Sequence, residues 1–401
     1  MEEVGTLIIG AGIAGSSLAM HLADLGEEDV VVVDPDLAGV RSSSELNAGG
    51  VRATWWREVN IEMCAHSIEY YGQHAEEFGF REKGYLWLYG PELWKGATQH
   101  AQTQNALGWP VELLTADEVV ARWPVIDNKE GIAGATFSPR DGLISPHAVK
   151  EHYRSRARAG GVEFRDRRLA VGMDRDDDAI TQVRLCHIED GLAAYRSLEG
   201  SPEDGPREAL RPLRVVNAAG PWAAKIARLM GGPVHSRAVR RQISVFASQD
   251  LDLSGQGMIV DTTGVYFHHE SGNLLLGGYS PPGDPPSYDF TYDGAAFFES
   301  EIWPRLAARM SAMDRLHHVH GWAGLYALTP DNSAILGGVE GVRNAFEIHS
   351  FSGRGIMQSY AAGLALAELI TTGRHQTFRR AERLDARRFA RGHEEPEDLH
   401  I

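Results

Sequence analysis

Three glycines near the start of the chain have the spacing of a phosphate-binding turn. Residues 10–15 read GAGIAG. In such a turn Gly10 permits a tight bend, Gly12 lets a pyrophosphate approach the backbone, and Gly15 lets helix and strand pack closely. The helix that follows offers its N-terminal N–H groups to phosphate oxygens. Asp34 comes roughly 20 residues later, where an acid can accept a hydrogen bond from a ribose hydroxyl. Together these residues predict a dinucleotide-binding site.

The segment that follows Asp34 distinguishes between the two common dinucleotides. The motif alone fits NAD as well as FAD. Residues 41–52 read RSSSELNAGGVR, which is small, polar and rich in glycine. Such a segment can surround a second large group and supply donors to a pyrophosphate and an isoalloxazine ring. An enzyme that uses nicotinamide does not need it there, so we expect FAD, and NAD dependence is the less favoured alternative.

The elements that must position these residues alternate between strand and helix. Apolar runs at Thr6–Gly10 and Val30–Asp34 flank a helical pattern at Ala14–Leu25, which makes a βαβ unit and implies a parallel sheet. Short alternating runs over Gln242–Tyr279 favour an antiparallel sheet. We therefore predict an α/β protein with a Rossmann-like FAD-binding domain and a second α+β substrate domain built on an antiparallel sheet. The expected boundaries are 1–84, 141–232 and 321–401 for the FAD-binding domain, and 85–140 and 233–320 for the substrate domain.

Further patterns predict the remaining elements. Helices are expected at about 58–79, 91–107, 147–158, 295–313 and 356–372. The polar stretch 187–212 favours an exposed hairpin or loop, and the stretch 393–401 resembles a frayed acidic tail.

Composition excludes several classes of partner. Asp and Glu (55) outnumber Lys and Arg (39), for a net charge of −16, so nucleic acid and anionic membranes would be repelled. The two cysteines have no metal-ligand spacing, and no metal site is expected. No basic leader precedes the first strand, and no apolar run is long enough to span a membrane, so a cytoplasmic location is expected. A homo-oligomer remains open.

Four segments resemble the FAD-dependent amine and amino-acid oxidoreductase superfamily typified by D-amino acid oxidase. They are GAGIAG with Asp34, the segment 41–52, VVNAAGPW at 215–222, and HSFSGRGIMQS at 349–359. The stretch 321–337 is similar to the region that precedes the last flavin-binding loop in that family. The nearest branch is that of sarcosine oxidase, glycine oxidase and dimethylglycine dehydrogenase. The resemblance covers nearly the whole chain and is specific for the family more than for the substrate.

The resemblance implies a set of cofactor contacts. The ADP half would meet Gly10, Gly12, Ile13, Ala14, Gly15, Asp34, Pro35 and the backbone of Val171; the pyrophosphate and flavin would meet Ser43, Ser44, Asn47, Ala48, Gly49, Gly50, Val51, Arg52, Ala219, Gly220, Trp222, Gly324, Gly353, Arg354, Gly355, Ile356 and Met357. The last loop starts a helix, so its partial positive charge can stabilise an anionic reduced flavin. Arg354 stands where many relatives have histidine and is permanently cationic.

The resemblance also implies catalytic and substrate residues. Tyr266 and Tyr326 match pocket tyrosines that position substrate, and Arg52 and Arg354 would tune the flavin. The expected substrate contacts are Trp55, Tyr266, His268, Tyr326 and Met357. His268 and His269 are adjacent on a strand, so only one of them can face a given pocket. A packing role remains the alternative for each aromatic residue, and His349 is a further candidate.

Three departures from the family pattern limit what can be predicted. The cationic residues that clamp a substrate carboxylate in relatives correspond to Trp55 and Met357, so either Arg52, Arg57 or Arg354 replaces them or the substrate is not a simple amino acid. No lysine follows Lys225. Relatives use such a lysine to activate oxygen, so oxidase and dehydrogenase remain equally open. Gly324 occupies the position of a flavin-linking cysteine, so FAD is expected to be noncovalent.

These features together predict an enzyme that oxidises the C–N bond of an amine or N-substituted amino acid. A hydride would pass to flavin N5, the imine would hydrolyse in water, and oxygen or an electron carrier would be the acceptor. One alternative on the same fold is oxidation of a 2-hydroxy acid or alcohol. Another is a flavin-binding assembly or scaffold protein with little turnover, which the missing clamp and lysine mildly favour.

Overall fold

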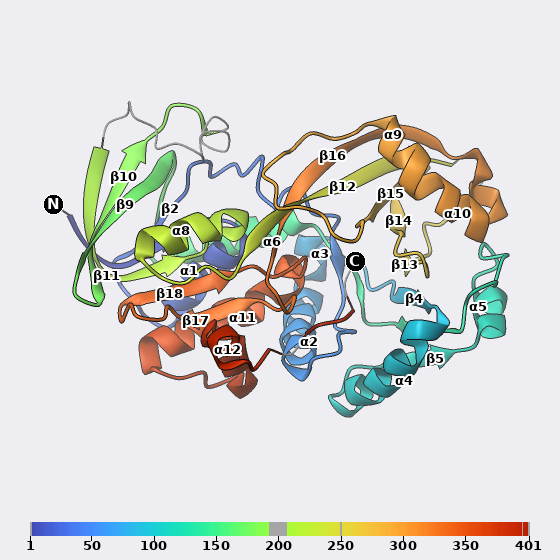
Figure 1. Cartoon of the computed structure of the whole chain (residues 1–401), viewed down its shortest axis with the longest axis horizontal. Coiled ribbons are helices and arrows are strands. Elements are labelled where there is room, and N and C mark those ends of the chain that lie inside the picture. Colours follow the sequence, from blue (N-terminus) through green and yellow to red (C-terminus); the bar gives the residue numbers. More distant parts are fainter. Residues whose placement is uncertain (1, 192–206, 249–250, 395, 400–401) are drawn as a thin grey trace. The chain divides into compact units, whose positions relative to one another are not determined.

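The computed structural model describes the chain except residues 1, 192–206, 249–250, 395 and 400–401. The described chain forms two compact units. The first comprises Met1–Asn47, Pro146–Val239 and Tyr326–Glu397, and the second Ala48–Ser145, Arg240–Leu325 and Asp398–Ile401. Figure 1 labels the helices and strands of the chain.

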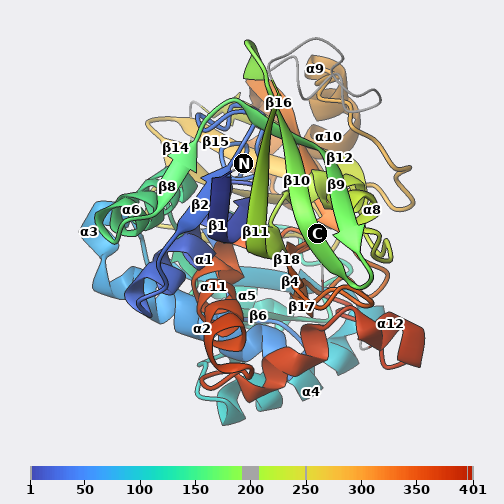
Figure 2. The same ribbon diagram turned by 90° about the vertical axis from the view of Figure 1, so that its left-hand side faces the viewer.

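The first unit is built on a sheet whose central strands run parallel, in the order β17-β18-β11-β1-β2-β8. Its strands are β1 (Glu2–Ile9), β2 (Val30–Val33), β8 (Glu163–Arg165), β9 (Arg168–Asp176), β10 (Ala179–His187), β11 (Arg207–Asn217), β17 (Ile335–Gly338) and β18 (Ala345–His349). Figure 2 shows β2, β1, β11, β10 and β9 side by side. Ile9 pairs with both Val33 and Asn217, so three strands end together. Ligands bind beyond this edge in sheets of this type.

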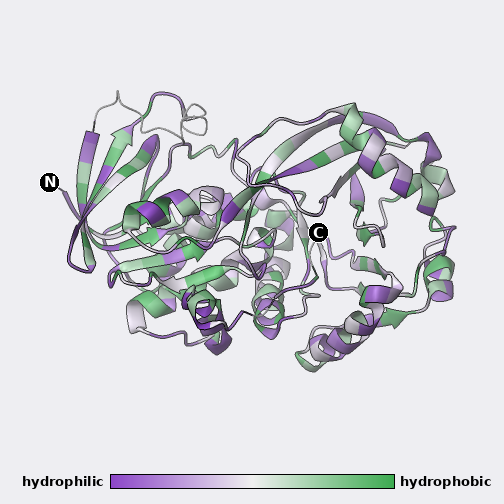
Figure 3. Ribbon diagram, viewed as in Figure 1, coloured by the Kyte–Doolittle hydropathy of each residue, from purple (hydrophilic) through white to green (hydrophobic). Residues whose placement is uncertain are grey.

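Helices cover this sheet and bury the one that follows the glycine turn. They are α1 (Ile13–Asp24), α6 (Pro146–Ala159), α8 (Ala223–Met230), α11 (Gly355–Thr372) and α12 (Arg387–Arg391), with short turns η1 (Gly220–Trp222) and η4 (Arg379–Leu384). Every residue of α1 from Ile13 to Leu22 is buried, because α6 and α11 both contact it. The α1–α11 approach is close: a Cβ on Gly363 would lie 2.2 Å from Ser17 Oγ. By contrast, Figure 3 shows α12 as largely hydrophilic.

The second unit contains a sheet in the order β16-β12-β15-β14-β13-β4-β6-β5. Its strands are β4 (Tyr85–Tyr89), β5 (Glu112–Leu114), β6 (Gly134–Ser138), β12 (Arg237–Ala247), β13 (Met258–Val260), β14 (Tyr266–Ser271), β15 (Leu274–Tyr279) and β16 (His317–Leu328), with the small pair β3 (Gly50–Val51) and β7 (Gly142–Leu143) beside it. Neighbours whose pairing is resolved run antiparallel except β13 and β4, which run parallel. The predicted fold class is confirmed.

The two faces of this sheet bury different clusters, because side chains alternate along a strand. Tyr85, Trp87 and Tyr89 of β4 lie in one cluster, whereas Leu86 and Leu88 lie in another. The helices are α2 (Glu58–Gln73), α3 (Ala75–Phe78), α4 (Pro91–Ala106), α5 (Ala116–Arg122), α9 (Ala295–Phe297), the π-helical η2 (Phe298–Ile302), α10 (Trp303–Arg309) and η3 (Ser311–Arg315). The cluster that holds Leu86 also contains residues of η2 and α10, so these helices cover its face of the sheet.

The structure differs from the expected elements in four places. Residues 48–84, 141–145 and 321–325, expected in the FAD-binding domain, belong to the second unit, and residues 233–239, expected in the substrate domain, belong to the first. Strand β11 begins at Arg207, inside the stretch expected to be loop or hairpin, where it pairs with β10; residues 192–206 lie outside the described chain. The helix expected at 295–313 is broken into α9, η2 and α10 before η3.

The fourth difference is the acidic tail, which the sequence predicted to fray. The prediction is wrong for at least two residues, because Glu397 is fully buried and Leu399 is 1% exposed. The backbone N–H of Glu397 donates to the carbonyl oxygen of Asp331 at 2.9 Å. Among the described residues, no helix is long and apolar enough to cross a membrane.

Candidate functional site

The glycine turn after β1 is closed by contacts that exclude side chains at two of its three glycines. A Cβ on Gly10, where φ is +110°, would lie 2.4 Å from the carbonyl oxygen of Ala218. A Cβ on Gly15 would lie 2.0 Å from the carbonyl oxygen of Gly10. At Gly12 the nearest described atom is Ser44 Oγ, at 3.5 Å. The first and third glycines therefore pack the strand against the helix, while the second leaves its backbone approachable.

The N-terminus of α1 is suited to an anion. Its N-cap is Gly12, which has no side chain to cap it, and its first turn contains no acid. The backbone N–H of Ile13 donates to Ser44 Oγ at 3.0 Å, which brings the predicted serine to the turn. The helix end thus keeps a partial positive charge that no acid of its own first turn neutralises.

Asp34 joins the end of β2 to the same turn. Its carboxylate accepts hydrogen bonds from the backbone N–H groups of Ala11 at 2.7 Å and Asp36 at 2.8 Å. Burial raises the pKa of Asp34 to about 6, although these two bonds and the charge of Arg154 act in the opposite direction. Asp34 therefore stands where the motif requires an acid, and it fixes the shape of the turn as well.

Arg154 of α6 was not predicted from the sequence, yet it holds the turn in place. Its side chain is 4% exposed. The guanidinium donates to the carbonyl oxygen of Ala11, to the carbonyl oxygen of Leu37 at 2.7 Å and to Ser16 Oγ at 3.3 Å. Arg154 is one of three arginines on α6, and nothing in the sequence distinguishes its role, because the turn that it meets is more than a hundred residues away.

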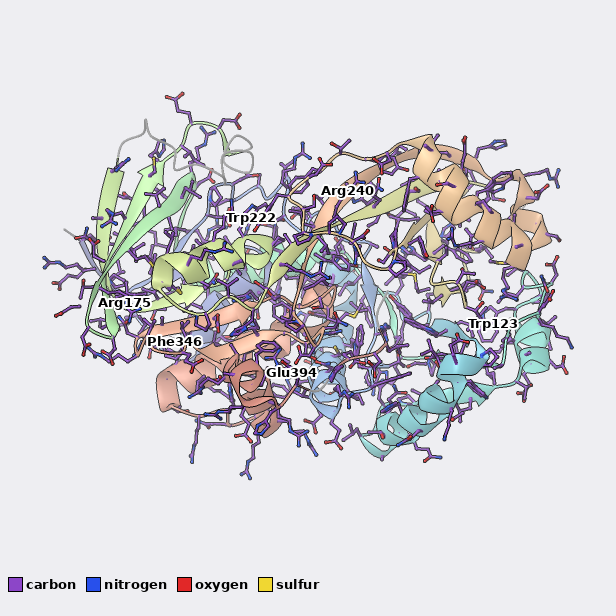
Figure 4. The ribbon with its side chains drawn as sticks, viewed as in Figure 1. Trp123, Arg175, Trp222, Arg240, Phe346 and Glu394 are labelled. Carbon is purple, nitrogen blue, oxygen red and sulfur yellow. The ribbon has the colours of Figure 1, made fainter. Side chains whose placement is uncertain are left out.

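The turn after β11 completes this edge of the first unit. Asn217 donates from Nδ2 to the carbonyl oxygen of Ala223 at 2.9 Å and accepts from the backbone N–H of Ala219 at 3.3 Å. Gly220 has a φ of +51°, which favours glycine. Trp222 is buried at the start of α8 (Figure 4). Of the other predicted cofactor contacts, Val171 lies on β9, Pro35 follows Asp34, and Ser43 and Asn47 lie in the segment before the second unit.

The last predicted loop joins β18 to α11 and meets Tyr326. Gly353 has a φ of +88°, and a Cβ there would lie 2.7 Å from the Tyr326 ring, so the tyrosine covers the loop directly. Ser350 and Ser352 also have positive φ values, +57° and +50°. Each such residue costs about 1–3 kcal/mol, and such strain clusters at functional sites.

Arg354 is fully buried at the N-cap of α11, and the first turn of this helix, which includes Gly355, Ile356 and Met357, contains no acid. His349 lies just before the loop, buried between Glu347 Oε2 at 3.1 Å and Ser350 Oγ at 2.8 Å. These contacts make His349 a support of the loop within its own unit.

The second unit places Arg52 in a buried aromatic setting. The Arg52 guanidinium carbon lies 3.5 Å from the centroid of the Trp55 ring and 4.6 Å from that of Trp87. Its Nη1 donates to the carbonyl oxygen of Thr54 at 2.7 Å, and the Trp55 indole donates to the carbonyl oxygen of Arg52 at 3.0 Å. Trp55 therefore stacks on the arginine, and Arg52 is a buried cation held by its neighbours.

Asp141, also missed in the sequence, anchors the same segment. The carboxylate accepts from the backbone N–H of Ala53 at 2.9 Å, from Trp109 Nε1 at 2.9 Å and from Thr54 Oγ1 at 3.2 Å. Asp141 is fully buried, and burial raises its pKa to about 7 against the effect of these bonds and of Arg52. The turn-rich stretch around it gave no sign that this residue would be buried.

Tyr266 and His268 occupy β14 on the side of the sheet that carries Trp87. Tyr266 is 7% exposed and belongs to the cluster of Tyr85, Trp87 and Met258. His268 is also buried, and His269 is partly exposed, which confirms that the two histidines face opposite ways. His268 Nε2 lies 3.0 Å from the carbonyl oxygen of Ala48, and burial lowers the pKa of the imidazole. His268 thus contacts the predicted flavin segment.

The predicted residues divide between the units, and the boundary falls between Asn47 and Ala48. The first unit contains Gly10–Gly15, Asp34, Ser44, Ala219–Trp222, Tyr326 and Gly353–Met357. The second unit contains Ala48, Gly49, Gly50, Val51, Arg52, Trp55, Tyr266, His268 and Gly324. Within the first unit the glycine turn, Ser44, Asp34 and Ala218 are in direct contact.

A parallel sheet with a glycine turn, an acid after β2 and an uncapped α1 defines the first unit as a dinucleotide-binding Rossmann-type fold. The family model described as "DAO: FAD dependent oxidoreductase" matches residues 6–369. The chain therefore belongs to this family of FAD-dependent oxidoreductases, and FAD is its cofactor.

Individual relatives agree with the family match. The chain is 29% identical over 416 residues to FAD-dependent oxidoreductase domain-containing protein 1 of Xenopus laevis, with 94% of this chain and 81% of that protein covered. It is 25% identical to mitochondrial dimethylglycine dehydrogenase of Homo sapiens, with coverage of 93% and 43%. The crystal structure of L-proline dehydrogenase from P. horikoshii matches with a TM-score of 0.84 and 26% identity, with coverage of 98% and 99%.

The residues present fit FAD. Gly12 leaves its backbone approachable, the N-terminus of α1 has no acid in its first turn, and Asp34 stands at the end of β2. In the same unit, the buried Arg354 begins a second helix with no acid in its first turn. Two helix ends and a buried guanidinium are suited to a group that carries a pyrophosphate and becomes anionic when reduced.

Proposed function

We propose that the protein oxidises the C–N bond of an amine or N-substituted amino acid. FAD, when bound, accepts the hydride that leaves the carbon atom next to nitrogen. A neutral amine that gives up this hydride would become an iminium ion, and water would hydrolyse the C=N bond to a carbonyl compound, the free amine and a proton. The names of two relatives given above, dimethylglycine dehydrogenase and L-proline dehydrogenase, contain substrates of this class.

The observation that carries the proposal is the cationic and aromatic group in the second unit. Arg52 is fully buried between Trp55 and Trp87, and Tyr266 lies in the same cluster as Trp87. A buried guanidinium binds a carboxylate strongly, and indole rings attract an alkylammonium group. This group therefore supplies both contacts that a small amino acid needs, although the cationic clamp of some relatives is replaced here by Trp55 and Met357.

The proposed roles of individual residues follow from their settings. Gly12, Ile13 and Ser44 would hold the pyrophosphate, and Asp34 would accept a ribose hydroxyl. Arg354 would offset negative charge on the reduced cofactor, because its guanidinium is buried and permanently charged. Tyr266 and Tyr326 would orient the substrate. Gly324 stands where a cysteine would be needed for a covalent link, so FAD is proposed to be noncovalent.

Anaerobic stopped-flow reduction tests this function. Purified FAD-loaded protein is mixed with a panel of amines, amino acids and N-methyl amino acids, and with the matching 2-hydroxy acids. We expect the C–N compounds to bleach the visible flavin bands and the hydroxy acids to leave them unchanged. Bleaching by hydroxy acids alone would overturn the proposal, as would no bleaching by any compound. Mixing the reduced protein with oxygen then separates an oxidase, which recovers its colour rapidly, from a dehydrogenase.

A further inference from the structure

Leu399 is an apolar residue near the end of an acidic segment, and the second unit buries it. Its side chain is 1% exposed and belongs to the cluster that contains Tyr266 and Trp87. The buried members of this cluster are Trp56, Tyr85, Trp87, Tyr89, Ala97, Leu143, Met258, Val260, Tyr266 and Leu399. We call the cluster without Leu399 the aromatic chamber. One leucine of the segment 398–399 thus fills part of a chamber otherwise formed by residues more than a hundred positions away.

The backbone of Leu399 is also recognised. Its carbonyl oxygen accepts a hydrogen bond from Arg52 Nη2 at 3.1 Å. Asp398 lies 3.9 Å from the Arg57 guanidinium, so a second arginine meets the same segment. The buried Arg52 guanidinium therefore donates both to its own loop, at the carbonyl oxygen of Thr54, and to this segment, at the carbonyl oxygen of Leu399. Leu399 thus offers its carbonyl oxygen to the Arg52 guanidinium and its branched side chain to the aromatic residues of the chamber.

The hydrogen bond from Arg52 and the packing of an apolar side chain against aromatic rings are contacts that a small ligand could also make. We infer that Leu399 occupies the substrate site, and that the natural substrate displaces it by presenting the same groups: a carboxylate oxygen for Arg52 and a branched apolar group of about leucine size. This inference rests on the proposed function only in taking the chamber as the substrate site. It goes further in naming the substrate class and in assigning to the chain's own segment the role of a competitor.

Physical chemistry favours such an exchange. A carboxylate carries a charge opposite to that of the guanidinium and can accept through both of its oxygens, whereas the carbonyl of Leu399 is neutral and offers one oxygen. The substrate would therefore regain the apolar contacts of the leucine and improve the polar one. Because only the protein molecules from which Leu399 has withdrawn can bind substrate, the apparent dissociation constant equals the intrinsic constant divided by the fraction of such molecules.

The variant Leu399→Ala tests the competition, because alanine gives up most of the apolar contacts of leucine and adds no group that Arg52 could bind. The matched control is Leu399→Met, which keeps an apolar side chain of similar volume. The probe is 4-methylpentanoate, which has the carbon skeleton of leucine without the amine and so cannot be oxidised at a C–N bond. Its binding to the FAD-loaded protein is followed by tryptophan fluorescence, with acetate as the small carboxylate for comparison.

We expect Leu399→Ala to bind 4-methylpentanoate about tenfold more tightly than the wild-type protein, which corresponds to about 1.4 kcal/mol. Leu399→Met should bind it as the wild-type does, and acetate should bind more weakly to every form. Equal affinity of Leu399→Ala and the wild-type protein for 4-methylpentanoate would overturn the competition. Acetate binding as tight as 4-methylpentanoate would overturn the ligand class.

A synthetic peptide of residues 396–401 gives a second test, in which the leucine is supplied as a separate molecule. Added to Leu399→Ala, this peptide should compete with 4-methylpentanoate, whereas the same peptide with Ala at position 399 should not. Failure of both peptides to compete would overturn the assignment. If the peptide competes but no amine bleaches the flavin, the amine chemistry is wrong and the occupancy by Leu399 stands. If amines bleach the flavin but neither the variant nor the peptide changes the binding of 4-methylpentanoate, the amine chemistry stands and the occupancy of the substrate site by Leu399 is wrong.

Discussion

The substitution Asp141→Asn tests how the second unit holds the Arg52 segment. The Asp141 carboxyl group is fully buried, and burial raises its pKa to about 7 from an ordinary value of 3.8. Three donated hydrogen bonds, from Ala53, Thr54 and Trp109, lower the pKa but do not offset the burial. The folded protein therefore keeps a proton on Asp141 in a pH range where the unfolded chain has lost it.

The sign of the effect follows from proton linkage. Between about pH 4 and pH 7 the folded state binds more protons at this site than the unfolded state, so stability falls as the pH rises through this window. One pH unit corresponds to 1.36 kcal/mol, so the loss between pH 5 and pH 8 is about 3 kcal/mol. Asparagine stays neutral from pH 5 to pH 8, so the Asp141→Asn variant does not lose this stability as the pH rises.

Urea unfolding of the wild-type and Asp141→Asn proteins at pH 5 and pH 8 measures the effect. We expect the free energy of unfolding of the variant, relative to that of the wild-type protein, to rise by about 3 kcal/mol from pH 5 to pH 8. Asp293→Asn is the control, because hydrogen bonding to Arg240 lowers the pKa of Asp293, which then titrates below this range. The difference in unfolding free energy between Asp293→Asn and the wild-type protein should be the same at pH 5 and pH 8. A constant difference for Asp141→Asn as well would refute the reasoning, since it would mean that Asp141 is ionised at pH 5.

Three further substitutions probe the first unit. Gly12→Val should abolish FAD binding, because the branched side chain blocks approach to the backbone; stoichiometric FAD in the purified variant would contradict this. Tyr326→Phe should slow anaerobic bleaching without release of FAD, and an unchanged rate would remove the Tyr326 hydroxyl from the substrate site. Asp331→Ala should lower the unfolding free energy by about 3–5 kcal/mol, since it leaves the buried Arg388 without the carboxylate that now accepts at 2.7 Å; a loss below about 1 kcal/mol in urea unfolding would count against this estimate.

The sequence predicts well what depends on local pattern. The run of apolar residues, the GAGIAG turn and Asp34 lie within one βαβ unit, so their spacing alone fixes β1, α1 and β2. The helix predicted at 356–372 agrees with α11 (Gly355–Thr372), because the glycine turn before it and Gly373 after it mark both ends. The family resemblance adds the order of the later segments, which local pattern cannot supply.

What the sequence misses depends on contacts between distant residues. Arg154 meets Ala11 across 143 positions, and Asp141 meets Ala53 across 88. A charged residue in a polar stretch is predicted to be exposed, and only the fold shows that these two are buried. Leu399 is the same case: the acids around it predict a solvated tail, yet a single leucine finds the apolar chamber and the Arg52 guanidinium.

The central claim is that one FAD binds to this chain without a covalent link and collects two electrons from the substrate. The most direct measurement is the visible spectrum of the purified protein, followed by heat or acid release and mass determination of the cofactor. We predict a yellow protein that releases one FAD per chain. A colourless protein that cannot be reconstituted with FAD, or release of a nicotinamide dinucleotide, would contradict the account.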